Sequence, residues 1–277
     1  MRLFCIFCSG FGIFHSICAR VIDFYFRVCY TNPKNATAKR RTLSMENKLY
    51  GKTVIFNGDS ICAGNEKFGS WATRLRAKNS INNIKNYAVG GGTISEGLCY
   101  QSGAPRHSVS ASLEKMHEEY PFADYIVLEG GTNDADLHSH IEDRDLRGSF
   151  DPDDFSGNYD RETFAGALES IFYRATKLWY GKRICYIVAH KMSSGRPFKN
   201  RRAYFDLAIE ICKKWGIPYL DLWNTCYLNS SLPWMYDPTK NAEENDAAGF
   251  MYADSQHLTS HGYDLTADII DSFLKTL

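Results

Sequence analysis

Four short stretches, far apart in this sequence, together carry the groups that acyl transfer requires. Residues 58–61 read Gly-Asp-Ser-Ile, 86–91 read Asn-Tyr-Ala-Val-Gly-Gly, 131–134 read Gly-Thr-Asn-Asp, and 254–257 read Asp-Ser-Gln-His. They supply a nucleophilic hydroxyl, a backbone donor at a glycine, a side-chain amide, and a base with a carboxylate three residues before it. Serine-dependent acyl transfer uses this set of groups. Each stretch alone fits many proteins, but the four together indicate that reaction.

Ser60 lies where the first predicted strand ends, so we expect its hydroxyl at the carboxyl edge of a sheet. A serine after an aspartate also commonly caps the next turn, which is the alternative for Ser60. Asp59 is expected to hydrogen-bond the backbone of this turn and hold Ser60 in place, rather than to act as a catalytic carboxylate.

His257 is the predicted base. Asp254 precedes it by three residues, so one tight turn brings the carboxylate to Nδ1 and leaves Nε2 free to accept the serine proton. The alternative is a surface histidine that caps the last helix. His261 is a rival base, but we expect it inside that helix, without a carboxylate at an equivalent offset. The two histidines lack the His-Glu-x-x-His pattern of a zinc site.

Gly91 and Asn133 are the predicted oxyanion donors, through a backbone N–H and a side-chain amide. An ordinary turn asparagine is the alternative for Asn133. The glycines at 90–92 also raise the question of a dinucleotide site, but Ser95 stands where the third glycine of that motif belongs, and the sequence has no Gly-Lys-Ser/Thr phosphate loop. We therefore predict no cofactor.

Composition narrows the class of protein. The chain has 277 residues, of which 44% are hydrophobic, and 32 basic residues balance 32 acidic ones, so the formal net charge is 32 − 32 = 0. A neutral chain has no general attraction for nucleic acid, so no nucleic-acid partner is predicted. The nine cysteines show no repeated spacing and are expected to be buried thiols in a reducing compartment. Five of them lie in the body of the chain: Cys62, Cys99, Cys185, Cys212 and Cys226.

The first 44 residues differ from the rest. The apolar run at 3–19 is shorter than the roughly 20 residues of a spanning helix, and a basic stretch follows at 39–41. This leader is an extension upstream of the natural start, a signal peptide, or a membrane anchor. We expect residues 45–277 to form the functional domain, with no strong membrane signal of its own. The expected location is cytoplasmic, or secreted or membrane-anchored if the leader acts as a signal or an anchor.

From residue 52 onward the chain alternates strand and helix patterns. Short runs rich in Val, Ile, Tyr or Leu predict strands at 53–57, 84–89, 125–129, 183–189 and 218–222. Helical patterns occupy 69–78, 109–119, 161–180, 200–215 and 260–275. Such alternation predicts an α/β fold, a parallel sheet covered by helices on both faces.

Two long segments interrupt the alternation, and both follow strand ends, where ligands bind in such sheets. Residues 135–160 are acidic, and a partial calcium-loop pattern at 151–154 fails because Phe155 stands at a ligand position, so we predict no metal site. Residues 223–253 are aromatic. Trp234 and Tyr236 are candidates for substrate binding, and the alternative is that these aromatics form a small core within the loop.

The four blocks resemble those of the SGNH hydrolases, also called GDSL-type esterases and lipases, over residues 51–277. The resemblance implies a three-layer α/β/α sandwich with a five-stranded parallel sheet in the flavodoxin-like order 2-1-3-4-5. It also implies Ser60 as nucleophile, His257 as base and Asp254 as the third member of a triad. The N–H groups of Ser60 and Gly91 and the Asn133 amide would form the oxyanion hole. The sequence departs from many members at Ala88, where they have glycine, and Gly91 has the better spacing from the block's asparagine.

We therefore expect a metal-independent serine esterase that acts on a small-molecule or carbohydrate ester. A carbohydrate O-acetyl esterase or short-chain esterase fits the polar and aromatic loops. A lysophospholipase or thioesterase is the alternative within the class. A catalytically inactive binding protein on the same fold is the alternative outside it, although a binder does not need the base, its carboxylate and the oxyanion donors.

Overall fold

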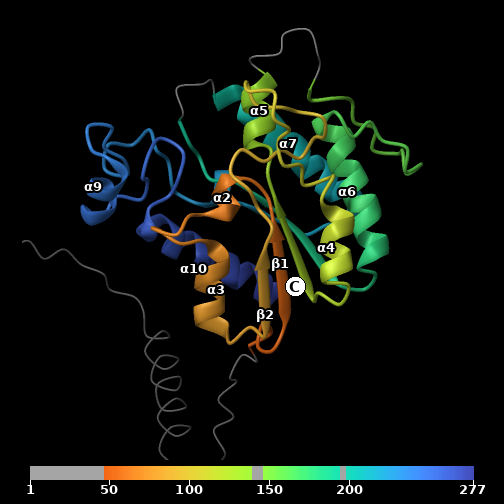
Figure 1. Cartoon of the computed structure of the whole chain (residues 1–277), viewed down its shortest axis with the longest axis horizontal. Coiled ribbons are helices and arrows are strands. Elements are labelled where there is room, and N and C mark those ends of the chain that lie inside the picture. Colours follow the sequence, from red (N-terminus) through yellow and green to blue (C-terminus); the bar gives the residue numbers. More distant parts are fainter. Residues whose placement is uncertain (1–46, 139–145, 194–197) are drawn as a thin grey trace, which may run out of the picture. The chain divides into compact units, whose positions relative to one another are not determined.

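The computed structural model describes residues 47–138, 146–193 and 198–277. The expected leader at 1–44 lies outside the described residues, as does the part of the acidic segment at 139–145. The described chain alternates strands and helices around a single sheet (Figure 1). No helix in these ranges is both long enough and apolar enough to cross a membrane.

Five parallel strands form the sheet, in the order β2-β1-β3-β4-β5. Their bounds are β1 Thr53–Asn57, β2 Asn83–Asn86, β3 Tyr125–Glu129, β4 Arg183–Val188 and β5 Tyr219–Asp221. The register pairs Phe56 with Val127 and Val127 with Cys185, so the three central strands end at one edge. The predicted order is confirmed, and it places the topological switch point between β1 and β3, where ligands bind in open sheets.

Helices cover both faces of this sheet (Figure 1). On one face α3 (Trp71–Asn79) packs on α10 (Ser260–Thr276), and the indole N–H of Trp71 donates to Thr266 Oγ1 at 2.9 Å. The other face carries a contiguous group of helices: α4 (Leu113–Glu119), α5 (Thr132–His138), α6 (Phe164–Leu178) and α7 (Phe198–Trp215). The result is the expected three-layer α/β/α sandwich.

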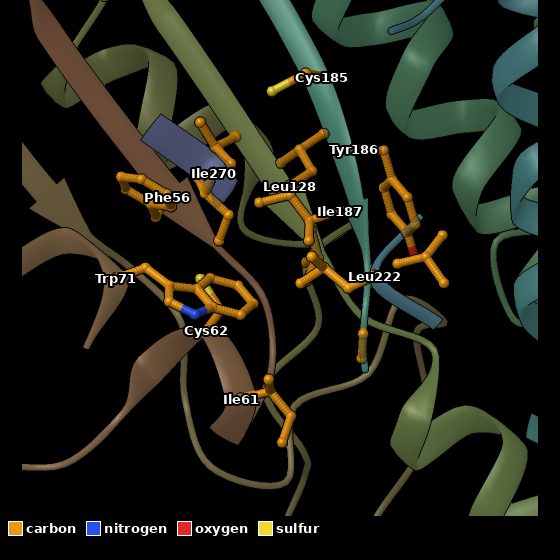
Figure 2. Packing of buried hydrophobic residues seen from close by; sticks show 14 of the residues in the cluster. Phe56, Ile61, Cys62, Trp71, Leu128, Cys185, Tyr186, Ile187, Leu222 and Ile270 are labelled. Carbon is orange, nitrogen blue, oxygen red and sulfur yellow. The ribbon is translucent and has the colours of Figure 1, made fainter. Parts of the chain in front are cut away.

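The central strands are buried because helices cover both of their faces. Every residue of β3 is buried, and so are all of β1 after Thr53 and all of β4 after Arg183. Figure 2 shows this core where Phe56 and Leu128 from the sheet meet Trp71 and Ile270 from the helices. Removing such large apolar side chains from water contributes roughly 1.5–3 kcal/mol each, which is why these short strands hold together.

Three predicted strands are shorter than their patterns: β4 lacks residue 189, β5 lacks residues 218 and 222, and β2 differs most. β2 ends at Asn86 instead of residue 89. The Asn86 side chain donates from Nδ2 to the carbonyl of Cys62 at 3.0 Å, and its Oδ1 accepts the N–H of Ala88 at 3.0 Å. This side chain turns the backbone out of the sheet, so the apolar run after it continues as a loop toward the glycines.

Short helices that periodicity does not reveal begin at several strand ends. α2 (Ser60–Ala63) and α5 each begin at the third residue after a strand, α8 (Leu222–Thr225) begins directly after β5, and α9 (Ala242–Ala247) lies within segment 223–253. Helices of one or two turns hold too few residues to show a 3.6-residue repeat. Segment 223–253 is therefore an ordered excursion rather than a bare loop, and Asn241 and Glu244 form a capping box at the start of α9.

Among the five cysteines of the described chain, four are buried thiols as expected and Cys99 is exposed. The expectation is wrong for Cys99 because it lies in the loop after the glycine run, away from the core.

Candidate active site

Ser60 is the first residue of α2 and the third residue after β1. Asp59 caps this helix, since its Oδ1 accepts the N–H of Ile61 at 2.8 Å. The backbone turn is thus held by Asp59 as expected. The Ile61 carbonyl accepts the hydroxyl of Tyr263 at 3.1 Å, which ties α2 to α10. Ser60 consequently lies at the carboxyl edge of the sheet with its side chain half-buried.

The structure brings Ser60, His257 and Asp254 together. Ser60 Oγ lies 2.8 Å from His257 Nε2, and His257 Nδ1 lies 2.8 Å from Asp254 Oδ2. These distances form a continuous hydrogen-bonded relay from hydroxyl to imidazole to carboxylate. His261 takes no part in it: it lies within α10, and its Nε2 is 3.1 Å from the Asp246 carbonyl.

The turn that carries His257 is fixed from both sides. Within the turn, Asp254 Oδ1 accepts the N–H groups of Gln256 and His257, each at 2.7 Å. From outside, the carbonyl of Ser255 accepts the N–H of Ser193 at 2.9 Å and the hydroxyl of Ser230 at 2.7 Å. The imidazole is therefore presented by a tied turn rather than by a free loop.

Electrostatics favour a strong base paired with an ionised carboxylate. Burial alone would lower the pKa of His257, but the hydrogen bond and charge of Asp254, together with the charge of Asp59, hold that pKa above its ordinary value. Burial alone would raise the pKa of Asp254, but its hydrogen bonds and the charge of His257 lower it. Asp254 is thus ionised at neutral pH and stabilises the imidazolium form.

Gly91 occupies a position that suits a backbone donor. Its φ is +75°, a conformation that favours glycine, and an added Cβ would lie 2.6 Å from the hydroxyl oxygen of Tyr100. Arg106 Nη1 donates to the Gly91 carbonyl at 2.8 Å, and the Tyr100 hydroxyl donates to the Gly90 carbonyl at 2.8 Å. The Arg106 and Tyr100 side chains both bind carbonyl oxygens and leave the Gly91 N–H unused. Across the described chain, the N–H groups of Gly91 and Ser60 have no protein acceptor.

Asn133 lies in the first turn of α5 rather than in an ordinary turn. Its Nδ2 donates one hydrogen to the Gly92 carbonyl at 2.8 Å, and an amide nitrogen carries a second hydrogen. The neighbouring Asp134 is buried and accepts the N–H groups of Ile94 at 3.0 Å and Ser95 at 2.9 Å. These bonds hold the Asn133 helix against the glycine loop, so the third and second blocks lie together.

Glu129, the buried last residue of β3, was not among the predicted site residues. Its Oε2 accepts the N–H of Asp59 at 3.1 Å, while its Oε1 and Asp59 Oδ2 have no partner in the described structure. Burial, reinforced by the neighbouring Asp59, raises the pKa of Glu129 well above its ordinary value. Burial also raises the pKa of Asp59 to about 6. A carboxylate that ends an otherwise apolar strand was the available sequence signal.

The two substrate-binding candidates differ in position. Trp234 is 68% exposed, whereas Tyr236 is half-buried against the core. Burial, and then the negative charge of Asp254, raise the pKa of Tyr236, so this ring lies within electrostatic range of Asp254. Other aromatics of the segment, Trp223 and Tyr252, are buried, which fits the alternative of a local core for that part.

No metal site is formed by the part of the chain that the structure describes: it contains no group of three or more His, Cys, Asp or Glu side chains arranged to hold an ion. At 151–154 the acidic side chains accept backbone N–H groups of their own turns, and Lys214 donates to the carbonyls of Asp151 at 2.8 Å and Asp154. The cation that balances this segment is therefore a lysine of the chain itself.

Comparison with known proteins identifies the family of this chain. Residues 56–265 match the sequence model of the GDSL-like Lipase/Acylhydrolase family, so the chain belongs to that family. A search of curated proteins finds no match.

Solved structures share the fold at low sequence identity. A protein from Lactobacillus plantarum is 18% identical with a TM-score of 0.59, over 82% of this chain and 98% of that one. The acetyl xylan esterase AlAXEase is 16% identical with a TM-score of 0.51, over 79% and 98%. A carbohydrate acetylesterase family member from Sinorhizobium meliloti is 13% identical with a TM-score of 0.51, over 81% and 98%.

Proposed function

We propose that this member of the family is a serine esterase that hydrolyses carboxylic esters through an acyl-enzyme. The observation that carries the proposal is the relay in which His257 lies 2.8 Å from Ser60 Oγ on one side and 2.8 Å from Asp254 Oδ2 on the other. A binding protein would not need a base aligned with both a hydroxyl and an ionised carboxylate.

In the first half-reaction, Ser60 Oγ attacks the ester carbonyl carbon while His257 Nε2 takes the serine proton. The carbonyl oxygen becomes an oxyanion, which the N–H groups of Ser60 and Gly91 and the second hydrogen of the Asn133 amide stabilise. The tetrahedral intermediate then collapses, the C–O bond to the alcohol breaks, and His257 returns the proton to the departing alkoxide.

In the second half-reaction, water attacks the acyl-Ser60 ester. His257 removes the proton from that water, the same donors stabilise the new oxyanion, and the carboxylic acid leaves as Ser60 regains its proton. Asp254 keeps its negative charge throughout, and its role is to orient the imidazole and stabilise its protonated form. The reaction needs only water besides the ester.

For the substrate class we propose short-chain esters, with O-acetylated carbohydrates first among them. Two observations support this. The exposed indole of Trp234 and the nearby Tyr236 offer flat apolar surfaces of the kind that stack on sugar rings. Two of the structures with this fold are named for acetyl ester cleavage on carbohydrates. Longer acyl chains, as in a lysophospholipase or thioesterase, are the competing outcome of the test.

The test compares acetyl, butyryl and octanoyl esters of one chromogenic alcohol, together with acetylated xylan, using Ser60→Ala as the matched control. We expect turnover that is highest for acetyl and absent in the control. A preference for octanoyl would transfer the proposal to the long-chain alternative. Equal rates in wild type and the control would overturn the esterase proposal itself.

A further inference from the structure

Arg201 is a buried cation that the proposed mechanism does not use. It belongs to α7, and its side chain is only 1% exposed. Its guanidinium makes a two-pronged ion pair with Asp136, with Nε to Oδ1 at 2.9 Å and Nη2 to Oδ2 at 2.8 Å. The same Nη2 donates to Gln256 Oε1 at 3.3 Å, and Nη1 donates to the Met192 carbonyl at 3.3 Å.

These partners belong to the elements that carry the proposed catalytic groups. Asp136 follows Asn133 by three residues, so both lie within one turn of α5. Gln256 directly precedes His257 in the tied turn. Met192 follows the end of β4, next to Ser193, whose N–H binds that same turn. One guanidinium therefore joins the helix of the oxyanion amide to the turn of the base.

The chemistry of arginine suits this task. Its planar fork fixes the direction of each donor, and a two-pronged pair with a carboxylate allows little rotation. A buried ion pair is weak evidence for stability, because desolvation of the two charges offsets much of their attraction. The buried charge between these two elements is thus better explained by the geometry that it fixes than by a gain in stability.

We propose that Arg201 is a positioning residue, which sets the distance between the Asn133 amide and the His257 imidazole by holding Asp136 and Gln256 at once. The proposal rests on the proposed esterase function. Because small displacements of catalytic groups cost up to about a hundredfold in rate, loosening this link should lower kcat.

Arg201 also leaves an electrostatic signature that is independent of turnover. The groups that act on the pKa of His257 are Asp254 and Asp59, which raise it, and Arg201, which lowers it. The buried His190, at the end of β4, is a further titratable neighbour, and burial lowers its own pKa to about 3, so it is neutral at working pH. Removing the Arg201 charge should therefore raise the pKa of His257.

The decisive variant is Gln256→Ala, which removes the contact to the turn and leaves the Arg201–Asp136 pair intact. Measured on a small acetate ester, it should lower kcat about ten- to a hundredfold with KM nearly unchanged. Arg201→Lys keeps the charge but loses the fork, and should lower kcat to a similar extent. The variant that combines Gln256→Ala with Arg201→Lys should lose little more kcat than either single variant, because both substitutions break the same link.

The matched control is Glu169→Gln. It breaks a similarly buried ion pair between Lys214, on the same helix as Arg201, and Glu169 on α6, with side chains 2% and 4% exposed, away from the Asn133 and His257 elements. Even where Glu169→Gln lowers the melting temperature as much as the other variants do, its kcat should equal that of wild type. The proposal would be overturned if Gln256→Ala kept the wild-type kcat. It would also be overturned if all of these variants, including Glu169→Gln, lost kcat and melting temperature in parallel.

NMR titration of the His257 ring in Arg201→Met and Arg201→Lys separates this inference from the esterase proposal. The midpoint should rise in the methionine variant and stay near wild type in the lysine variant. If wild type hydrolyses no ester but the midpoint behaves in this way, the proposed function fails while the link between Arg201 and the base stands. If esters are hydrolysed and neither the midpoint nor the kcat of Gln256→Ala changes, the positioning role fails alone.

Discussion

Two aspartates flank the Ser60–His257 pair, and their surroundings shift the two carboxyl pKa values in opposite directions. Asp254 lies in the 254–257 turn with its side chain 53% exposed, and its oxygens accept bonds from two backbone N–H groups and the imidazole. Asp59 directly precedes Ser60, is 1% exposed, and has one oxygen without a partner in the described structure. The pKa of Asp254 is lowered, whereas burial raises that of Asp59 to about 6.

The comparison shows that proximity to a base does not decide the role of a carboxylate. Asp254 is half-exposed and its oxygens accept hydrogen bonds, so it keeps a negative charge beside the imidazole. Asp59 is desolvated and shares its site with Glu129, so it serves better as the cap of α2. Exposure to solvent thus distinguishes the aspartate proposed to be catalytic from the one that caps α2 within the same small site.

The strongest test of the catalytic side is removal of the relay itself. Ser60→Ala and His257→Ala should each lower kcat by about a millionfold, as loss of a nucleophile or base does in a working triad. Stopped assays on an acetate ester with circular dichroism as a folding control would measure this. Ser60→Ala with substantial residual turnover would mean that another group is the nucleophile.

The sharpest test of the comparison pairs Asp254→Asn with Asp59→Asn. The first should lower kcat by about 10⁴, because the imidazole loses its orienting anion. The second keeps an oxygen acceptor for the Ile61 N–H and should cost about tenfold or less. Similar losses in the two variants would contradict the assignment of separate roles.

The pH profile provides a second measure of the same difference. His257 must be neutral to act as base, and its pKa is raised, so the acid limb of kcat/KM should lie above the ordinary value of about 6.5. In Asp254→Asn the hydrogen bond and charge that raise this pKa are lost, so the limb should move to lower pH. An unchanged limb would show that the limb does not report His257.

Asn133→Ala should have a smaller effect, confined to the rate. Loss of one oxyanion donor costs roughly 10²–10³ in kcat, and KM should change little because the donor acts on the transition state. Steady-state kinetics on a short ester provide the measurement. A change in KM alone would reassign Asn133 to substrate binding.

Glu129→Gln tests the buried side through stability. The pKa values of Glu129 and Asp59 are raised in the folded state, so their stabilising contribution is present below the unfolded values and is lost as the pH rises through the folded ones. The variant removes one of these acids, so it should exceed wild type in unfolding free energy by at least about 1 kcal/mol at pH 8 and differ little at pH 4. Urea unfolding at both values measures this, and a loss independent of pH would contradict it.

The smallest effect is expected for Trp234, an exposed residue of segment 223–253. Trp234→Ala should raise KM for an acetylated xylan oligomer about two- to tenfold, as loss of one aromatic contact does, and leave a minimal acetate ester unaffected. Phe122→Ala is the matched control, since Phe122 is 81% exposed and precedes β3 at the opposite edge of the sheet. Equal losses on both substrates together with lower thermal stability would make Trp234 structural.

The sequence by itself determined the features that depend on neighbours in the chain. The apolar runs fixed β1 and β3 at their observed bounds, since strands this short and this apolar have no competing pattern. The contact between Asp254 and His257 spans three residues and closes through local hydrogen bonds, so spacing alone predicted it. The order of the sheet followed from the resemblance of the four blocks to a known family.

Only the tertiary structure decided what depends on packing between distant segments. Ser60 and His257 are 197 positions apart, and the hydrogen bond between them exists because α2 and the 254–257 turn meet at one sheet edge. The same holds for the Arg201 link to Asp136, across 65 positions, and for the hydrogen bond from the Asp59 N–H to Glu129. The pKa directions of Asp59 and Asp254 also escaped the sequence. A carboxylate titrates according to the solvent and donors around it, and those are assembled only when the chain has folded.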